Sequence, residues 1–161
     1  MIKKALVVIR KITNFIVVFL FVVVVAVVFA QVIARYVVGF SIGWADEVAR
    51  YAFVWLVYIG GTTTIRDGRN VCFDLILESC SGKTWKVMFT LVNLASALFL
   101  VFMIYLGILV SQTQMIAKSP IMHWPMSFVT VAIPLGGLLM FFEQISYYIQ
   151  HINNTEHEKE A

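Results

Sequence analysis

Charged side chains are scarce in this chain, and their absence from long stretches is its main feature. Only 13% of the 161 residues are charged and 61% are hydrophobic, whereas about 25% of residues are charged in soluble domains. Residues 12–34 contain no charge at all. As an α-helix rising about 1.5 Å per residue, they are long enough to cross about 30 Å of hydrocarbon. The composition excludes a water-soluble domain and predicts an integral membrane protein.

Cysteine and histidine are scarce as well, which removes several classes of function. The two cysteines, Cys72 and Cys80, lie on the expected cytoplasmic side and predict neither a disulfide nor a metal site. The three histidines, His123, His151 and His157, lie at helix ends or in the tail, without metal-ligand spacing. A haem anchor would need histidines inside the spans, and a thiol oxidase would need outer cysteine pairs. We therefore expect no enzymatic activity, metal or cofactor in this chain.

Four apolar segments predict an all-α membrane protein with four transmembrane helices in a single membrane domain. The predicted spans cover residues of about 12–35, 46–66, 86–112 and 127–149. The first segment exceeds the roughly 7–15 residues of a signal-peptide core, so we expect it to be retained. Pro134 falls inside the last span, where neighbouring helices can satisfy the carbonyl group that it frees.

Two further segments are amphipathic without being long enough to span. Residues of about 1–11 and 70–80 predict short helices that lie in the inner interface with their apolar faces toward the lipid. An ordinary connector is the alternative for both. Residues 153–161 form a short charged tail that we expect to fray.

The basic residues indicate the orientation. They lie at the ends of the apolar runs and form no continuous patch, so the net charge of +3 does not indicate a nucleic-acid partner. With the N-terminus inside, the outer side holds only Arg35, Arg50 and Lys118. The inner side holds Lys3, Lys4, Arg10, Lys11, Arg66, Arg69, Lys83, Lys86 and Lys159. Because Lys and Arg accumulate in cytoplasmic loops, both termini are predicted to be cytoplasmic.

The start of the second span carries the densest group of functional candidates. It reads Trp44-Ala45-Asp46-Glu47-Val48-Ala49-Arg50-Tyr51. Arg50 lies three residues after Glu47 and four after Asp46, so either pair can form on one helix. The acids also favour a helix N-terminus, where the macrodipole is positive. The pattern fits a self-paired helix cap at the outer interface, or a contact surface for a partner protein.

Three other features stand out. Glu143 is the one acid well inside a span, and it fits a proton site, a side chain that reaches the inner interface, or a partner of a nearby basic residue. Gly60 and Gly61, followed by three threonines, permit close helix approach. Pro120 and Pro125 predict a short, stiff outer loop, which is either a docking point or a simple turn.

Together these residues resemble the small membrane subunit of tripartite ATP-independent periplasmic (TRAP) transporters, over about residues 5 to 150. The resemblance is carried by Ala34-Arg35-Tyr36, Trp44-x-Asp46-Glu47-x-x-Arg50-Tyr51, Phe53-Val54-Trp55, Gly60, Arg66-x-Gly68, Val71-x-x-Asp74, Ser119-Pro120, Pro125 and Pro134-x-Gly136. Asn70 departs from the pattern, because the family often has histidine there, so the resemblance supports no titrating group at this position.

The resemblance implies a non-catalytic scaffold in the bacterial inner membrane. TRAP transporters are Na⁺-coupled importers of organic acids such as sialic acid or C4-dicarboxylates. A large membrane subunit holds the substrate and Na⁺ sites and moves as an elevator, and a periplasmic protein delivers the substrate. The residues agree with a scaffold role, because a carrier would show positive groups or broken helices at mid-membrane. The first and third spans have no charge there, and the fourth has only Glu143.

Two sets of residues are assigned on this basis. Docking of the binding protein is predicted for Arg35, Lys118 and His123, with lipid-headgroup binding as the alternative for Arg35. Contact with the large subunit, or with a lipid wedged beside it, is predicted for Trp44, Asp46, Glu47, Arg50, Tyr51, Gly60 and Gly61. The alternative functions are a self-sufficient small proton-coupled exporter that uses Glu143 and a membrane anchor for a redox enzyme.

Overall fold

All regular secondary structure in the described part of the chain is helical. The computed structural model describes residues 2–66 and 83–157. It contains helix α1 (Ile2–Ile33), the short π-helix η1 (Ala34–Val38), α2 (Gly43–Arg66), α4 (Lys83–Thr113), the single turn α5 (Ser127–Thr130) and α6 (Ala132–His157). No β-strand is present in these two ranges. The predicted all-α class is confirmed.

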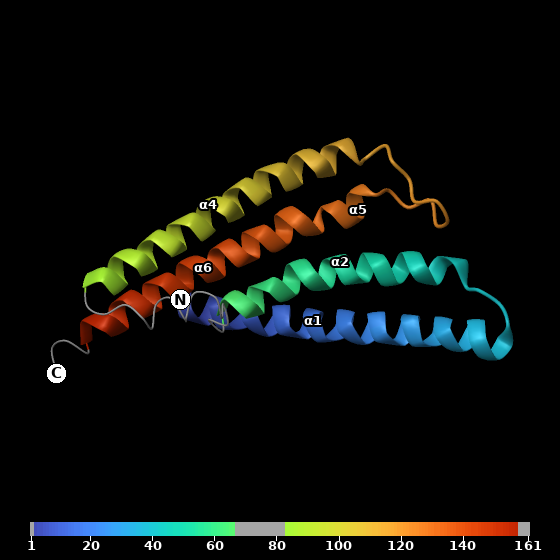
Figure 1. The fold of residues 1–161 in the computed structure, drawn as a ribbon, viewed down its shortest axis with the longest axis horizontal. Coiled ribbons are helices and arrows are strands. Elements are labelled where there is room, and N and C mark those ends of the chain that lie inside the picture. Colours follow the sequence, from blue (N-terminus) through green and yellow to red (C-terminus); the bar gives the residue numbers. More distant parts are fainter. Residues whose placement is uncertain (1, 67–82, 158–161) are drawn as a thin grey trace.

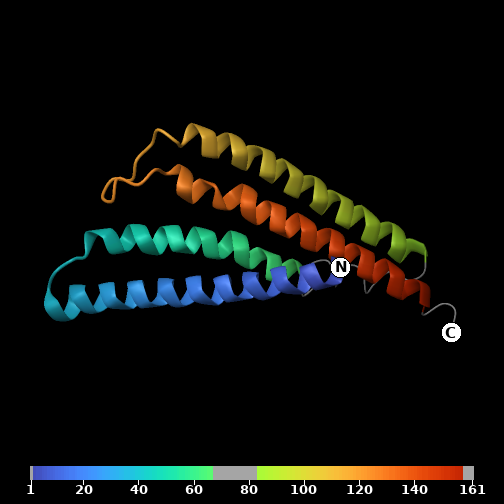
Figure 2. The ribbon, with the colours of Figure 1, turned by 180° about the vertical axis from the view of Figure 1, so that it is seen from behind.

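The four long helices form an open layer rather than a closed bundle. Helix α1 packs against α2, α2 against α6, and α6 against α4, while the described parts of the two outer helices do not meet. Figures 1 and 2 show this order from opposite sides, with α1 and α4 at the edges of the layer. Because each edge helix has a neighbour on only one side, most of its surface stays uncovered. All 18 residues of the most apolar window of α1 are unburied.

Three helical segments are long and apolar enough to cross a membrane. They are Leu6–Val38, Thr84–Thr113 and Ser127–Gln150, which makes the chain a multi-pass membrane protein. The remaining predicted span corresponds to α2, which is helical over Gly43–Arg66 but less apolar. Asp46, Glu47 and Arg50 at its start and the threonines near its end reduce its hydropathy. Length and hydropathy therefore support three of the four predicted spans directly.

The predicted interfacial segments have different outcomes. The prediction of a separate short helix at the N-terminus is wrong. Residues 2–11 belong to the same unbroken helix as the first span. The predicted segment 70–80, with Asn70 and both cysteines, lies outside the described residues. In the tail, α6 continues as helix to His157.

Glycine and proline determine how α6 meets its two neighbours, α2 and α4. A Cβ atom added to Gly136 of α6 would lie 2.6 Å from Cβ and 2.8 Å from the carbonyl oxygen of Tyr58 in α2. Gly107 of α4 approaches Pro134 equally closely, since a Cβ there would lie 2.9 Å from the proline ring. Pro134 lies in the first turn of α6, directly after the break that separates α5 from α6. A proline costs least there because the first turn has no intrahelical partner for its N–H group.

Candidate interaction surfaces

The segment between α4 and α5 folds into a short hairpin, residues 117–126, which we call the outer hairpin. The Met126 N–H group donates to the Ala117 oxygen at 2.9 Å, and the Ser119 N–H group donates to the Trp124 oxygen at 2.8 Å. Lys118 and Pro125 form an isolated antiparallel bridge between these bonds. His123 has a φ of 56°, an uncommon backbone for a residue other than glycine. The prediction of a non-helical loop is confirmed.

Glu47 holds the outer hairpin against the first turns of α2. Its carboxylate accepts hydrogen bonds from the Ile121 and Met122 N–H groups, both at 3.0 Å, and from the Ser119 hydroxyl group. These three donors match the acceptor-only character of an ionised carboxylate. The Glu47 side chain is only 5% exposed. The acid is therefore internal to the chain and ties two segments together.

Tyr51 lies one helical turn beyond Glu47 and is also buried. Its hydroxyl group is directed at the Met126 sulfur atom, 3.7 Å away, at the base of the outer hairpin. The expected partner surface at the start of α2 is thus smaller than predicted, because Glu47 and Tyr51 face the chain itself. Trp44, Asp46 and Arg50 stay exposed and available for a partner.

The two glycines near the other end of α2 also differ in their surroundings. A Cβ atom on Gly61 would run into the Met140 side chain of α6, so Gly61 belongs to the internal contact between α2 and α6. A Cβ atom on Gly60 would have nothing within 4 Å. Of the predicted pair, only Gly60 presents an open notch on the surface.

The predicted docking residues lie at one end of the helix layer. Arg35 is in η1, directly before the connection to α2, and Lys118 and His123 are in the outer hairpin. All three are exposed. Figure 1 shows that the connection between η1 and α2 and the outer hairpin extend from the same end of the molecule. The fold therefore brings two sequence-distant cations, Arg35 and Lys118, to one end of the helix layer.

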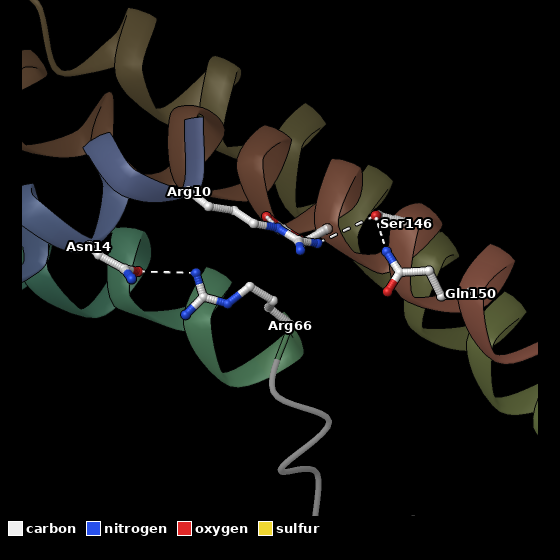
Figure 3. Close-up of polar contacts among 6 residues, drawn as sticks. Arg10, Asn14, Arg66, Ser146 and Gln150 are labelled. Atoms are coloured by element: carbon white, nitrogen blue, oxygen red, sulfur yellow. Dashed lines mark hydrogen bonds and ion pairs between the residues drawn. The ribbon is translucent and has the colours of Figure 1, made fainter. Parts of the chain in front are cut away.

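The opposite end holds a polar cluster between α1, α2 and α6. Arg10 of α1 makes a two-pronged ion pair with Glu143 of α6, with Nε 2.9 Å from Oε1 and Nη2 2.6 Å from Oε2. Arg66 of α2 donates to the Asn14 side-chain oxygen at 3.1 Å. Figure 3 shows both guanidinium groups in this cluster, with Ser146 beside Arg10. Of the alternatives for Glu143, pairing with a basic residue is the one that the structure contains.

A second internal contact involves two residues that the sequence did not single out. The Gln144 side-chain amide of α6 donates to the Asn93 oxygen of α4 at 2.6 Å, and Asn93 in turn donates to the Phe89 oxygen at 2.8 Å. Both amides are buried. Amide side chains within apolar helices are a signal for such interhelical bonds, because an unpaired amide is costly in lipid. Within residues 2–66 and 83–157, no three His, Cys, Asp or Glu side chains gather where they could hold a metal ion.

Comparisons with known proteins identify the family of the chain. Residues 24–154 match the family described as tripartite ATP-independent periplasmic transporters, DctQ component. A similar protein is the C4-dicarboxylate TRAP transporter small permease protein DctQ of Rhodobacter capsulatus, which is 29% identical over 104 residues. The aligned part covers 63% of this chain and 46% of that relative, so the chain spans less than half of the relative's length. The family match covers most of the chain, which therefore belongs to the DctQ family of TRAP transporter small permease subunits.

Proposed function

We propose that this chain is the stationary scaffold of a Na⁺-coupled TRAP importer of organic acids in the bacterial inner membrane. In this proposal all four long helices span the membrane and both termini are cytoplasmic. The chain braces a large subunit that moves as an elevator and carries the substrate and Na⁺ sites, and it helps to dock a periplasmic substrate-binding protein. C4-dicarboxylates, named for the relative, are the first substrates to test, and sialic acid is the second.

The observation that carries the proposal is the open, single layer of helices. A carrier needs a polar site at mid-membrane, built from charged groups or from the ends of broken helices. In the described helices, an ionisable pair and a pair of amides are used for internal contacts between helices. Glu143 pairs with Arg10, and Gln144 bonds to Asn93. This arrangement supports a scaffold role over the alternative of a small exporter that uses Glu143 as its proton site.

The exposed face of α2 supports a contact with the large subunit. Six residues recur at alternating intervals of four and three along this helix: Asp46, Arg50, Phe53, Val57, Gly60 and Thr64. We call this set the α2 stripe. Phe53 is 54% and Val57 50% exposed, and Gly60 forms the open notch. Alternating steps of three and four keep residues on one side of a helix, as in helix pairs that pack closely.

The chemistry of the α2 stripe distinguishes it from a surface that faces lipid. It contains an acid, a base, a threonine and a glycine notch, whereas no exposed side chain over residues 15–30 of the edge helix α1 is polar, and many are bulky, such as Phe15, Phe19 and Val22. Charged groups in a membrane almost always face protein or water, and small residues let a second helix approach closely. A transmembrane helix of the large subunit satisfies both requirements.

Reconstitution tests the scaffold proposal. Proteoliposomes that contain this chain alone should take up no succinate under a Na⁺ gradient. Vesicles with the large subunit, this chain and the binding protein should take up substrate, and omission of this chain should abolish uptake. Transport by the isolated chain would contradict the proposal, and so would full transport without it.

Two matched substitutions test the contact with the large subunit. Gly60→Phe fills the notch in the α2 stripe, where an added Cβ atom would meet nothing within 4 Å, and it should prevent co-purification of the large subunit. Ala26→Phe places the same ring on the exposed surface of α1 and should leave co-purification intact. Equal effects of the two variants would show that the α2 stripe is not the contact surface.

A charge reversal tests docking. Arg35→Glu should weaken binding of the periplasmic protein and slow uptake while the membrane complex still assembles, because Arg35 is exposed at the end of the layer that also carries Lys118 and His123. Lys11→Glu reverses an exposed charge at the other end and is the control. Normal uptake by the Arg35 variant would refute its assignment.

A further inference from the structure

The outer hairpin is seated on the start of α2 through one side chain. The Ile121 and Met122 N–H groups both donate to the Glu47 carboxylate at 3.0 Å. The Ser119 hydroxyl group donates to the same carboxylate. The Ile121 side chain also lies beside the first residue of α2, since a Cβ atom on Gly43 would lie 3.8 Å from its Cδ1 atom. Glu47 thus connects three residues of the hairpin to the helix.

The residues that Glu47 binds are the chain neighbours of the two predicted docking residues in the hairpin. Lys118 directly precedes Ser119, and both Lys118 and His123 are exposed. His123 directly follows Met122, and its Nδ1 atom lies 3.1 Å from the Ser119 carbonyl oxygen. Ser119 itself is only 2% exposed. Glu47 therefore holds the backbone from which both exposed side chains project.

We propose that Glu47 is a positioning residue for docking of the periplasmic binding protein, and that it acts through the outer hairpin. The inference rests on the proposed docking role of Lys118 and His123. It goes beyond that role, because it assigns a part in docking to a side chain that is only 5% exposed and is bound within the chain. The partner surface that fits is acidic, since Arg35 and Lys118 are the cations at this end of the layer.

Preorganisation is the physical reason that this seat affects affinity. A loop or side chain that has to be ordered when a partner binds reduces the binding free energy. Without the Glu47 carboxylate, the Ile121 and Met122 N–H groups lose their acceptor. His123 has a φ of 56°, and a residue other than glycine keeps such a backbone only where surrounding contacts hold it. Loss of the seat therefore makes docking pay for ordering the hairpin.

Uptake by the reconstituted complex, measured over a range of binding-protein concentrations, tests the inference. Proteoliposomes contain this chain and the large subunit, and the binding protein is supplied outside with succinate. Glu47→Gln should raise the half-saturating concentration of binding protein about tenfold, because two docking side chains then have to be ordered on binding. Maximal uptake and co-purification with the large subunit should stay at the wild-type level.

Glu143→Gln is the matched control. It makes the same acid-to-amide change in an internally paired carboxylate at the other end of the layer. It should leave the half-saturating concentration of binding protein unchanged, although it lowers the stability of the chain. Ser119→Ala removes one of the three hydrogen bonds to Glu47 and should give a smaller increase than Glu47→Gln.

Double variants show whether Glu47 acts through the hairpin. Lys118→Gln/His123→Gln removes both docking side chains of the hairpin and should by itself raise the half-saturating concentration. Adding Glu47→Gln to this variant should change that concentration by less than about twofold, because no docking side chain is left to position. Arg35 lies in η1, outside the hairpin, so the effects of Arg35→Glu and Glu47→Gln should multiply.

The outcomes separate this inference from the docking proposal. An increase with Lys118→Gln/His123→Gln but none with Glu47→Gln would refute the positioning role alone, and no increase with either would overturn both. Equal increases with Glu47→Gln and Glu143→Gln would identify lost stability as the cause. Loss of co-purification from a folded Glu47→Gln chain would place its effect at the large subunit instead. If circular dichroism shows that Glu47→Gln is unfolded, Ser119→Ala is judged by the same criteria.

Discussion

Two glycine-to-alanine substitutions with opposite expected effects test the packing of the layer. Both Gly60 and Gly136 lie in the long helices, and alanine improves helix propensity by about 1 kcal/mol in each case. Their surroundings differ. A Cβ atom on Gly60 would have nothing within 4 Å, whereas one on Gly136 would meet Cβ and the backbone of Tyr58. The pair therefore separates close helix contact from intrinsic propensity.

The size of the expected stability loss in Gly136→Ala follows from the geometry at Tyr58. The added Cβ would lie 2.6 Å from Cβ of Tyr58, against 3.4 Å for ordinary contact, so α2 and α6 have to separate by about 0.8 Å. The opposing atoms belong to the backbone and Cβ, which no side-chain rotation can move away. A gap of this size forfeits about a quarter to a half of each dispersion contact. Overpacking costs about 1–3 kcal/mol and the gain in helix propensity offsets about 1 kcal/mol of it, so the net loss for Gly136→Ala is about 0–2 kcal/mol.

Equilibrium unfolding of the purified chain measures the difference in stability between the two variants. In mild detergent micelles titrated with dodecyl sulfate and followed by far-UV circular dichroism, Gly60→Ala should be as stable as the wild type or more stable. Gly136→Ala should be less stable, with the two variants about 2 kcal/mol apart. Gly61→Ala should fall between them, because its neighbour is the flexible end of Met140. A Gly136→Ala protein as stable as Gly60→Ala would refute the inferred contact between α2 and α6.

Three further predictions concern the internal polar contacts. Glu143→Gln should lower the free energy of unfolding by about 2 kcal/mol, because it leaves Arg10 partly buried beside a neutral amide. In the same titration, the double variant Arg10→Gln/Glu143→Gln should be at least as stable as Glu143→Gln alone. Glu47→Gln should loosen the outer hairpin, because an amide cannot accept on both sides, and faster amide hydrogen exchange in this segment without a change in α4 would be the evidence. Gln144→Leu should cost about 1–3 kcal/mol by leaving the buried Asn93 oxygen without its donor, and Asn93→Leu in the same chain should recover part of that loss in the unfolding titration.

Local sequence properties were sufficient to predict which parts of the chain form helices. The predicted spans match two helices to within three residues, 46–66 against Gly43–Arg66 for α2 and 86–112 against Lys83–Thr113 for α4. Helix α1 begins ten residues before its predicted span, and α6 ends eight residues after its own. Paired prolines predicted that the segment of the outer hairpin is a loop and not a helix, because proline cannot continue a helix. The boundary expected near residue 11 does not exist, because nothing in the sequence before Ile12 breaks a helix. A change from basic to apolar composition alters where a helix can lie, and it does not end the helix.

The assignment of the interface residues needed the tertiary structure. The motif at the start of α2 was recognised, but its two acids serve different purposes, since Asp46 is exposed and Glu47 is bound by the outer hairpin. The two consecutive glycines likewise divide into an open notch at Gly60 and an internal contact at Gly61. Neighbouring residues of a helix point about 100° apart, so only the positions of the other helices decide which of them faces inward.

By itself, the sequence determined the membrane class, the helical segments, the non-helical outer loop and the resemblance to TRAP small subunits. These follow from hydropathy, charge and backbone chemistry that act over a few neighbouring residues. The tertiary structure alone decided the order of helices in the open layer, the partner of Glu143 and the bonds to Glu47. Arg10 and Glu143 are 133 residues apart, and Glu47 and Ser119 are 72 apart. Contacts over such separations depend on how whole helices pack and rotate, which no local pattern records.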